Sequence, residues 1–267
     1  MKRNLYFSEP PRTDQTIKVL AIGNSFSEDA TTYLRQMALA DGVDLRVMNH
    51  WRPGCSLERH HENLQSGAAD YRSVFYTPEM VYTAIPTTLE QGVLASDWDY
   101  VTLQQVSAAS GNYASFEPHA SILIAYLRER LPEAKLYFHM TWAYPENEAG
   151  LEKMKRFGYA SQAEMHQSIT KVYTHFSADY GHVPLIPTGE AIRLARASKM
   201  GDVFSRDAIH CDIKGRIVTG WVWYEIFTGI SPFESRFDPK TILEELTDEE
   251  ITIMKQAAHD AVLAYHQ

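Results

Sequence analysis

The stretch KVLAIGNSFSEDA, residues 18–30, passes from an apolar run into Gly23-Asn24-Ser25 and then into a helical pattern. The apolar run, IKVLAIG at 17–23, lacks the alternation of a half-exposed strand, which predicts a strand buried on both faces. Apolar residues spaced by three and four over 29–40 predict a helix after it. The stretch therefore predicts a strand, a tight turn and a helix, with a serine at the turn.

The same alternation continues along the chain. Short apolar runs predict strands at 44–49, 98–106, 134–142 and 183–187, and helical patterns between them include 116–131 and 161–180. Alternating strands and helices build right-handed βαβ units. We therefore expect an α/β fold with a parallel sheet covered by helices on both faces.

The chain length suits one large α/β domain. Its 267 residues, 45% of them hydrophobic, can bury a sizeable core, and no linker or repeat divides them, so we predict one domain over 1–267. Residues 1–16 are predicted to be a polar N-terminal extension. The connections 51–97 and 143–160 are unusually long and follow strands. We expect them as insertions at the edge of the sheet where the carboxyl ends of the strands lie.

Charge and apolar patterning argue against two kinds of partner. Lys and Arg number 25 against 34 Asp and Glu, a net charge of −9, and no basic footprint for nucleic acid is found. No apolar run approaches the ~18–20 residues of a membrane span. The start, MKRNLYFSEPPRTDQ, lacks the apolar segment of a secretory signal, so we expect a cytoplasmic protein. A signal removed before this start would instead allow a periplasmic one.

The cysteines and histidines predict neither a disulfide framework nor a metal site. Cys55 and Cys211 are too few for either, and we expect both to be free, with one bridge between them left open. In LERHHEN, residues 57–63, the adjacent His60 and His61 point about 100° apart on a helix and cannot readily share an ion. We expect a solvated helix face there, and neither a metal nor an organic cofactor.

Ser25 has two interpretations. SFSE matches the S-x-x-E capping box, with Ser25 as the N-cap and Glu28 reaching back. A nucleophilic serine occupies the same place, because its hydroxyl would project from the sheet edge at a strand-to-helix turn. Only a partner base distinguishes the two.

Two D-x-x-H motifs supply candidate bases, since an Asp three residues before a His can hold its second ring nitrogen. They are DYGH, with Asp179 and His182, and DAIH, with Asp207 and His210. His182 directly precedes the strand at 183–187 and so enters from the edge opposite the strands' carboxyl ends. His210 lies in a later loop that can return to Ser25, so we predict that it is the base.

The ordered motifs resemble the SGNH (GDSL-like) hydrolase superfamily. The set AIGNSFSEDA, GCSLERH, TLQQVSAASG, IPTGEAI and DAIHCDIKGR is similar to an uncharacterised bacterial branch of SGNH-like proteins common among gut Bacteroidetes. The resemblance covers roughly residues 17–230. It implies a three-layer αβα sandwich of flavodoxin-like type with a five-stranded parallel sheet.

The resemblance also implies roles for individual residues. Ser25 would be the nucleophile, His210 the base and Asp207 its orienting partner, with the backbone N–H groups of Ser25 and Gly54 in the oxyanion hole. The superfamily pattern after the third strand, G-x-N-D, has an oxyanion Asn that LQQVSAASG lacks. We predict that Gln105, or less readily Gln104, supplies the carboxamide instead; an amide that pairs with local backbone is the alternative. Asn24 stands where many relatives have Asp.

These residues predict a serine esterase that hydrolyses a short-chain acyl ester, acetyl in the first place, of a carbohydrate or similar small polar alcohol. Trp142 and Tyr144 follow a strand, and we predict that they bind substrate by stacking on a sugar ring, beside Gln104. The alternatives are a lipase-like or thioester hydrolase on the same site, and a catalytically inactive protein of this fold that binds carbohydrate. The expected partner is a small ester such as an acylated sugar, and the oligomeric state is left open.

Overall fold

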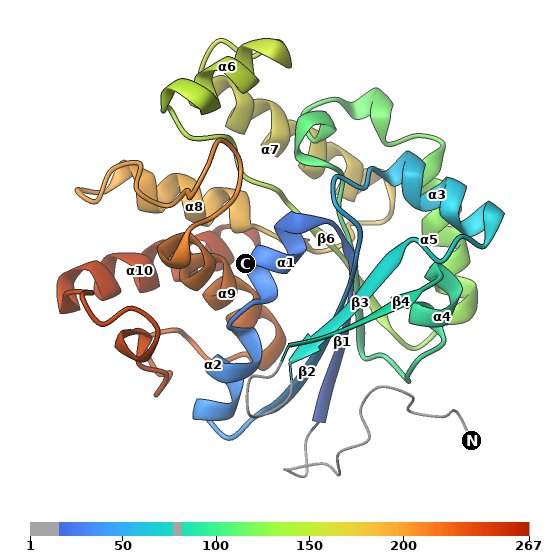
Figure 1. Ribbon diagram of the computed structural model, residues 1–267, viewed down its shortest axis with the longest axis horizontal. Coiled ribbons are helices and arrows are strands. Elements are labelled where there is room, and N and C mark those ends of the chain that lie inside the picture. Colours follow the sequence, from blue (N-terminus) through green and yellow to red (C-terminus); the bar gives the residue numbers. More distant parts are fainter. Residues whose placement is uncertain (1–15, 77–81, 267) are drawn as a thin grey trace.

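A computed structural model describes residues 16–76 and 82–266 and places a sheet between two layers of helices (Figure 1). Within these residues the sheet has seven strands in the order β4-β3-β2-β1-β5-β6-β7. The strands are β1 (Thr16–Gly23), β2 (Asp44–Trp51), β3 (Tyr71–Tyr76), β4 (Tyr82–Thr87), β5 (Tyr100–Leu103), β6 (Lys135–His139) and β7 (Leu185–Ile186). Strands β2, β1, β5, β6 and β7 are parallel to one another. After β1 the chain adds β2 on one side of it and later adds β5 on the other side, so the strand order reverses between β1 and β5. Open α/β sheets place their ligand sites in the crevice at such a switch point.

The predicted α/β class is confirmed, whereas the prediction of a five-stranded parallel sheet is wrong. Two more strands, β3 and β4, come from the long connection 51–97 and extend the sheet beside β2 in antiparallel fashion. Their sequences, YRSVFY and YTAIPT, are rich in aromatic and β-branched residues. An antiparallel hairpin needs no crossover helix, so a single connection can add two strands.

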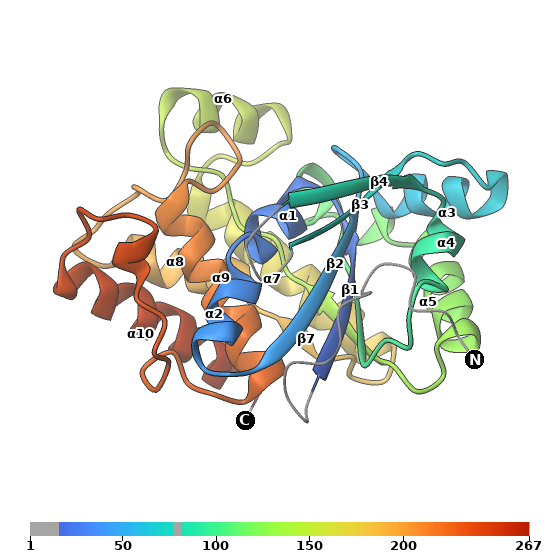
Figure 2. The same cartoon turned by 60° about the horizontal axis from the view of Figure 1, so that its bottom comes forward.

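The helices cover both faces of the sheet (Figures 1 and 2). One layer holds α1 (Ser25–Thr31), α2 (Leu34–Ala40), α8 (Thr188–Ala197), α9 (Ile213–Thr228) and α10 (Asp248–Tyr265). The other holds α3 (Leu57–Ser66), α4 (Leu89–Val93), α5 (His119–Arg130) and α7 (Gln162–Asp179). Helix α9 is central to the first layer, and its Trp221, Trp223 and Tyr224 are fully buried.

Several predicted boundaries change. The helix expected over 29–40 is two helices, α1 and α2, which meet at Thr32 and Tyr33. The connection 143–160 contains a further helix, α6 (Glu148–Arg156), rather than only a loop. Of the predicted extension 1–16, Thr16 begins β1 and the rest lies outside the described residues. None of the helices in residues 16–76 and 82–266 combines the length and apolar character that crossing a membrane requires.

Candidate active site

Asn24 lies in the turn between β1 and α1 and is the N-cap residue of α1. Its Oδ1 atom accepts a hydrogen bond from the N–H of Phe26 at 3.0 Å. Ser25 is therefore the first residue of α1, and the predicted capping box of Ser25 with Glu28 is wrong. Because the cap lies one residue earlier, helix capping does not engage the Ser25 hydroxyl.

Gln104, which directly follows β5, packs tightly against this turn. A Cβ on Gly23 would lie 2.9 Å from Gln104 Cδ, so glycine is required for the close approach. Gln104 donates to Asn24 Oδ1 at 2.6 Å, and its own oxygen lies 2.7 Å from His139 Nδ1. The prediction that Gln104 binds substrate is wrong, because its buried carboxamide holds Asn24 in place.

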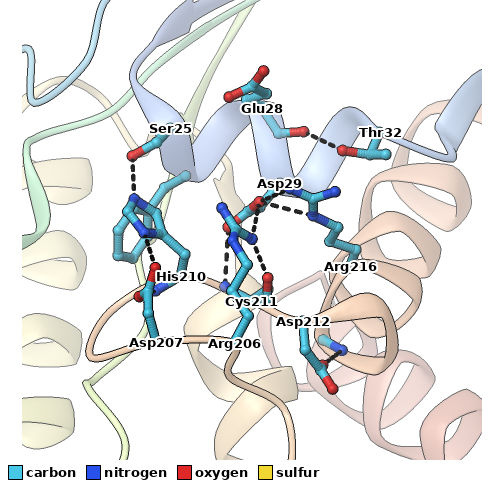
Figure 3. A network of polar contacts seen from close by, with 12 residues as sticks. Ser25, Glu28, Asp29, Thr32, Arg206, Asp207, His210, Cys211, Asp212 and Arg216 are labelled. Carbon is cyan, nitrogen blue, oxygen red and sulfur yellow. Dashed lines mark hydrogen bonds and ion pairs between the residues drawn. The ribbon is translucent and has the colours of Figure 1, made fainter. Parts of the chain in front are cut away.

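Ser25, His210 and Asp207 form a continuous chain of hydrogen bonds (Figure 3). Ser25 Oγ lies 2.9 Å from His210 Nε2, and His210 Nδ1 lies 2.8 Å from Asp207 Oδ2. The carboxylate accepts the Nδ1 proton, so in the neutral ring Nε2 is left to accept the proton of Ser25. The structure thus brings together the three residues that the sequence proposes for catalysis.

Asp207 is held ionised by its own loop. Its other oxygen accepts the backbone N–H groups of Ile209 and His210, each at 2.8 Å. Partial burial acts to raise the pKa of this carboxyl, but the hydrogen bonds from the backbone and ring of His210 and from Ile209 outweigh it and lower the pKa. The charged form that orients the imidazole is therefore favoured.

The second Asp-x-x-His motif has no such arrangement. Asp179 accepts a hydrogen bond from Tyr113 and pairs with His175. His182 is exposed in the turn before β7, at the amino end of that strand. Since Ser25 follows the carboxyl end of the parallel strand β1, His182 lies at the opposite edge of the sheet, as predicted.

A pocket of about 360 Å³ opens beside Ser25 and His210. Gly54 also lines it, from a turn closed by the hydrogen bond of Cys55 N–H to Arg52 O at 3.2 Å. Gly54 has φ +60°, a conformation that favours glycine. Asn24 Nδ2 donates to Cys55 O at 3.1 Å and so ties this turn to the turn that carries Ser25. Ser25 and Gly54, the expected backbone donors, therefore face one pocket.

Gln105 is not available to an oxyanion. Its Nε2 donates to Ser115 O at 2.9 Å, and its Oε1 accepts the N–H groups of Leu57 and Val106. The side chain is almost fully buried and does not line the pocket. The prediction that Gln105 replaces the oxyanion Asn is wrong, and the alternative, an amide paired with nearby backbone, is the one observed.

Trp142 and Tyr144 are core residues rather than a platform for a sugar ring. Trp142 is fully buried, stacks on Phe26 with ring centroids 4.1 Å apart, and donates from Nε1 to Ile209 O at 2.9 Å. Tyr144 is also buried, and its hydroxyl lies 3.0 Å from Ser107 Oγ. Neither ring has a free face for a ligand, so this prediction is wrong.

We therefore expect Trp142→Ala to act on stability. Truncating a buried Trp leaves a large cavity and typically costs about 3–5 kcal/mol, and here it also releases Ile209 on the loop of the base. Urea unfolding measures the loss. The control, Phe233→Ala, removes a ring that is 46% exposed and should change the free energy of unfolding by less than about 0.5 kcal/mol. Unchanged stability with a raised KM would instead favour the platform for a sugar ring.

Sequence reasoning missed several residues that line the pocket. Trp51, the last residue of β2, lies there with Val106, Ser107 and Arg206. The sequence positions of two of these residues could have suggested that they line the pocket, because Trp51 directly precedes the RPGCS turn and Arg206 directly precedes Asp207. Nothing in the local pattern separates such residues from core residues.

The predicted surface cluster in LERHHEN is partly buried. His60 is fully buried, with Nδ1 2.7 Å from the Tyr71 hydroxyl, and His61 Nδ1 lies 3.1 Å from His119 Nδ1. The expected solvated face is therefore wrong for His60, which faces inward from α3 and packs against Tyr71 of β3. Cys55 and Cys211 are both buried and free, so the predicted free state is confirmed.

Comparisons with known proteins identify the family of this chain. The family model described as Domain of unknown function (DUF4886) matches residues 18–261. A DUF4886 family protein from Bacteroides uniformis ATCC 8492 is similar to this chain, with 34% sequence identity and a TM-score of 0.85 over 93% of this chain and 95% of that one. A search of curated proteins found no match.

Two further solved structures are similar at lower identity. A proposed SGNH hydrolase from Slackia heliotrinireducens has 19% identity and a TM-score of 0.56, over 79% of this chain and 98% of that one. A proposed GDSL-like lipase from Parabacteroides merdae ATCC 43184 has 15% identity and a TM-score of 0.51, over 82% and 99%. These likenesses concern the fold, and at that level the predicted resemblance to SGNH (GDSL-like) proteins is confirmed. The chain belongs to the DUF4886 family, and its fold is that of the SGNH-like hydrolases.

Proposed function

We propose that this protein is a serine esterase that removes a short acyl group, acetyl in the first place, from a carbohydrate or similar small polar alcohol. The observation that carries the proposal is the chain of hydrogen bonds from Ser25 through His210 to Asp207 beside a pocket of about 360 Å³. Similarity to structures described as hydrolases adds support at the level of fold.

The proposed reaction begins with acylation of Ser25. Its Oγ attacks the acyl carbon while His210 Nε2 takes the hydroxyl proton, and Asp207 holds the imidazole in the required tautomer. The negative charge on the carbonyl oxygen is stabilised by the backbone N–H groups of Ser25 and Gly54. When the tetrahedral intermediate collapses, the bond to the alcohol breaks and His210 gives its proton to the leaving oxygen.

Deacylation repeats the sequence with water. His210 removes a proton from a water molecule as it attacks the acyl carbon of the acyl-enzyme. The second tetrahedral intermediate collapses, the bond to Ser25 Oγ breaks, and His210 returns the proton to that oxygen. The products are a carboxylic acid and the free alcohol, and the enzyme is regenerated without a net change.

The lining of the pocket favours a short acyl chain. A volume of about 360 Å³ is near the lower end of ordinary ligand pockets. Phe26, Trp51, Val106 and Ile209 supply apolar walls that suit a methyl or ethyl group. A lipase would bury a long chain to gain ~0.8 kcal/mol per methylene, which requires a continuous apolar groove, whereas Asn24, Ser107 and Arg206 interrupt the apolar lining of this pocket.

A chain-length series of nitrophenyl esters tests the proposal. We expect the highest kcat/KM on acetyl to butyryl esters and a decline of roughly tenfold or more by octanoyl, because additional methylenes would lie against the polar side chains Asn24, Ser107 and Arg206. Acetylated sugars and acyl thioesters are assayed beside them. A maximum at eight carbons or more would favour the lipase-like alternative, and a preference for thioesters would favour a thioesterase.

Covalent labelling separates enzyme from binding protein. A fluorophosphonate reacts only with an activated serine, so the wild-type chain should be labelled at Ser25. Absence of both labelling and turnover, with retained carbohydrate binding, would support the inactive alternative.

A further inference from the structure

Hydrogen bonds between its own residues shape the loop that carries Asp207 and His210, and Trp142 also donates to Ile209 O from outside the loop. Ser205 and Cys211 form an antiparallel bridge, and Arg206 N–H donates to His210 O at 3.0 Å. Among the residues that the structure describes, Asp207 accepts hydrogen bonds from within this loop, at Ile209 and at His210. These contacts fix the acid relative to the base, but they do not fix either one relative to Ser25.

One carboxylate, Asp29, joins this loop to the helix of the nucleophile (Figure 3). Asp29 lies one turn after Ser25 on α1 and is fully buried. Its Oδ2 accepts the N–H of Cys211, the residue after the base, at 2.9 Å. Its Oδ1 accepts from Arg206 at 2.8 Å and from Arg216 on α9 at 2.9 Å.

The contacts of Asp29 span the whole loop. Arg206 precedes Asp207 and Cys211 follows His210, so the carboxylate holds both ends, and Arg206 also donates to Cys211 O. Arg216 ties the same atom to the buried helix α9. Asp29 does not line the substrate pocket. Its influence on the reaction is therefore indirect, through the place of the loop.

The negative charge of Asp29 explains why a neutral residue at this position would not hold the loop. Two guanidinium groups share one buried carboxylate, and losing its charge would leave two cations packed against a neutral amide. An Asn would also turn a donor toward either Cys211 N–H or the two arginines. The loop would then shift to recover its hydrogen bonds.

We propose that Asp29 is a positioning residue that holds His210 at hydrogen-bond distance from Ser25 by docking the 205–211 loop onto α1. The proposal rests on the proposed esterase function. A displacement of the base by about 1 Å typically lowers turnover ~10²-fold.

The test compares Asp29→Asn with a matched control, Asp44→Asn. Asp44, at the start of β2, is also fully buried and pairs with two arginines, Arg46 at 2.8 Å and Arg35 at 3.4 Å. It lies at the amino end of the parallel strands, away from the pocket. Both variants should lose stability. At a temperature where circular dichroism shows both folded, Asp29→Asn should lower kcat roughly 10²-fold with KM within about threefold, whereas Asp44→Asn should retain kcat.

Two more measurements distinguish a positioning role of Asp29 from a general loss of stability. If Asp29→Asn does not fold, Arg216→Gln removes one of the three contacts and should lower kcat about tenfold. Amide hydrogen exchange at Cys211 should be faster in Asp29→Asn than in wild type or Asp44→Asn, whether or not an ester substrate is known. Equal kcat and equal exchange in Asp29→Asn and wild type would overturn the positioning role, as would equal loss of kcat in Asp44→Asn. A wild-type chain that fluorophosphonate does not label would overturn the proposed function instead. Hydrogen exchange at Cys211 would still show whether Asp29 holds the 205–211 loop on α1.

Discussion

Ser25→Ala is expected to lower kcat on a nitrophenyl acetate by roughly 10⁴–10⁶-fold, and His210→Ala by a similar factor. The two side chains share one step, because the 2.9 Å contact carries the proton that leaves Ser25 as it attacks. The double variant should therefore be little worse than either single one. Asp207→Asn should cost as much or less, since the imidazole then loses its preferred tautomer but keeps its place.

Steady-state kinetics with fluorophosphonate labelling measures these losses. Ser121→Ala is the matched control, since Ser121 is a serine on α5 whose hydroxyl donates to Pro118 O at 2.7 Å, and it does not line the pocket. It should keep wild-type activity and labelling. If the losses of Ser25→Ala and His210→Ala multiplied in the double variant, the two residues would not act in one step. Full activity in Ser25→Ala would remove the serine mechanism altogether.

We expect acid to unfold the protein at a pH well above the range in which carboxyl groups titrate. His50, His60 and His139 are fully buried, and burial lowers the pKa of each to about 3. The unfolded chain takes up these protons near pH 6.5, whereas the native chain resists them until about pH 3. Stability is therefore lost as the pH falls from about 6.5 towards 3. At pH 5 the free energy of unfolding falls by an amount on the order of 2 kcal/mol per histidine. For the three histidines together the loss is about 6 kcal/mol, which is comparable to the whole stability of many domains.

The contacts of these histidines explain why the native state resists protonation. The ring of Tyr71 stacks with both His50 and His60, with centroids 4.3 and 5.6 Å away, so two imidazolium charges would lie close together in a buried site and would repel one another. His139 already donates to Gln104, which in turn holds Asn24 beside Ser25. An added proton would therefore go to Nε2 of His139, which lies 2.8 Å from Thr188 Oγ1, and would place a charge in the core.

Denaturant unfolding between pH 8 and pH 4 measures this effect. His60→Gln removes one titrating ring and should reduce the slope of stability against pH below 6 by about 1.4 kcal/mol per unit. His175→Gln is the control, because the His175 side chain is 61% exposed and should leave the slope as it is. A stability that stays flat from pH 7 to pH 4.5 would contradict the prediction.

The sequence predicts much of this fold because its signals are local. Unalternated apolar runs identify buried parallel strands, and the Asp207-x-x-His210 pair lies within one turn of chain. The β3–β4 hairpin has no such signal, since its pairing beside β2 depends on contacts between separate segments. The sequence therefore yields the class and the parallel strands, but not the full width of the sheet.

The errors at the site concern where side chains point. Gln105 finds partners at Leu57 and Ser115, respectively 48 and 10 positions away, and no local pattern shows that they are nearer than the pocket. Trp142 follows a strand at the expected edge, yet Ile209 and Phe26 cover it from two other segments. Asp29 was unremarkable in sequence, because its partners lie at least 177 positions later in the chain.

The side chain of Asn24 carries an evolutionary constraint. It accepts on Oδ1 from Phe26 and Gln104 and donates from Nδ2 to Cys55 O, so it needs both an acceptor and a donor. An Asp, which the resemblance to SGNH proteins gives for many relatives at this position, has only acceptors when ionised and would set an oxygen against the Cys55 carbonyl. A change from one residue to the other would therefore turn that carbonyl away, and with it the turn that holds Gly54. We expect position 24 and the Pro53-Gly54-Cys55 turn to have been inherited as a matched pair.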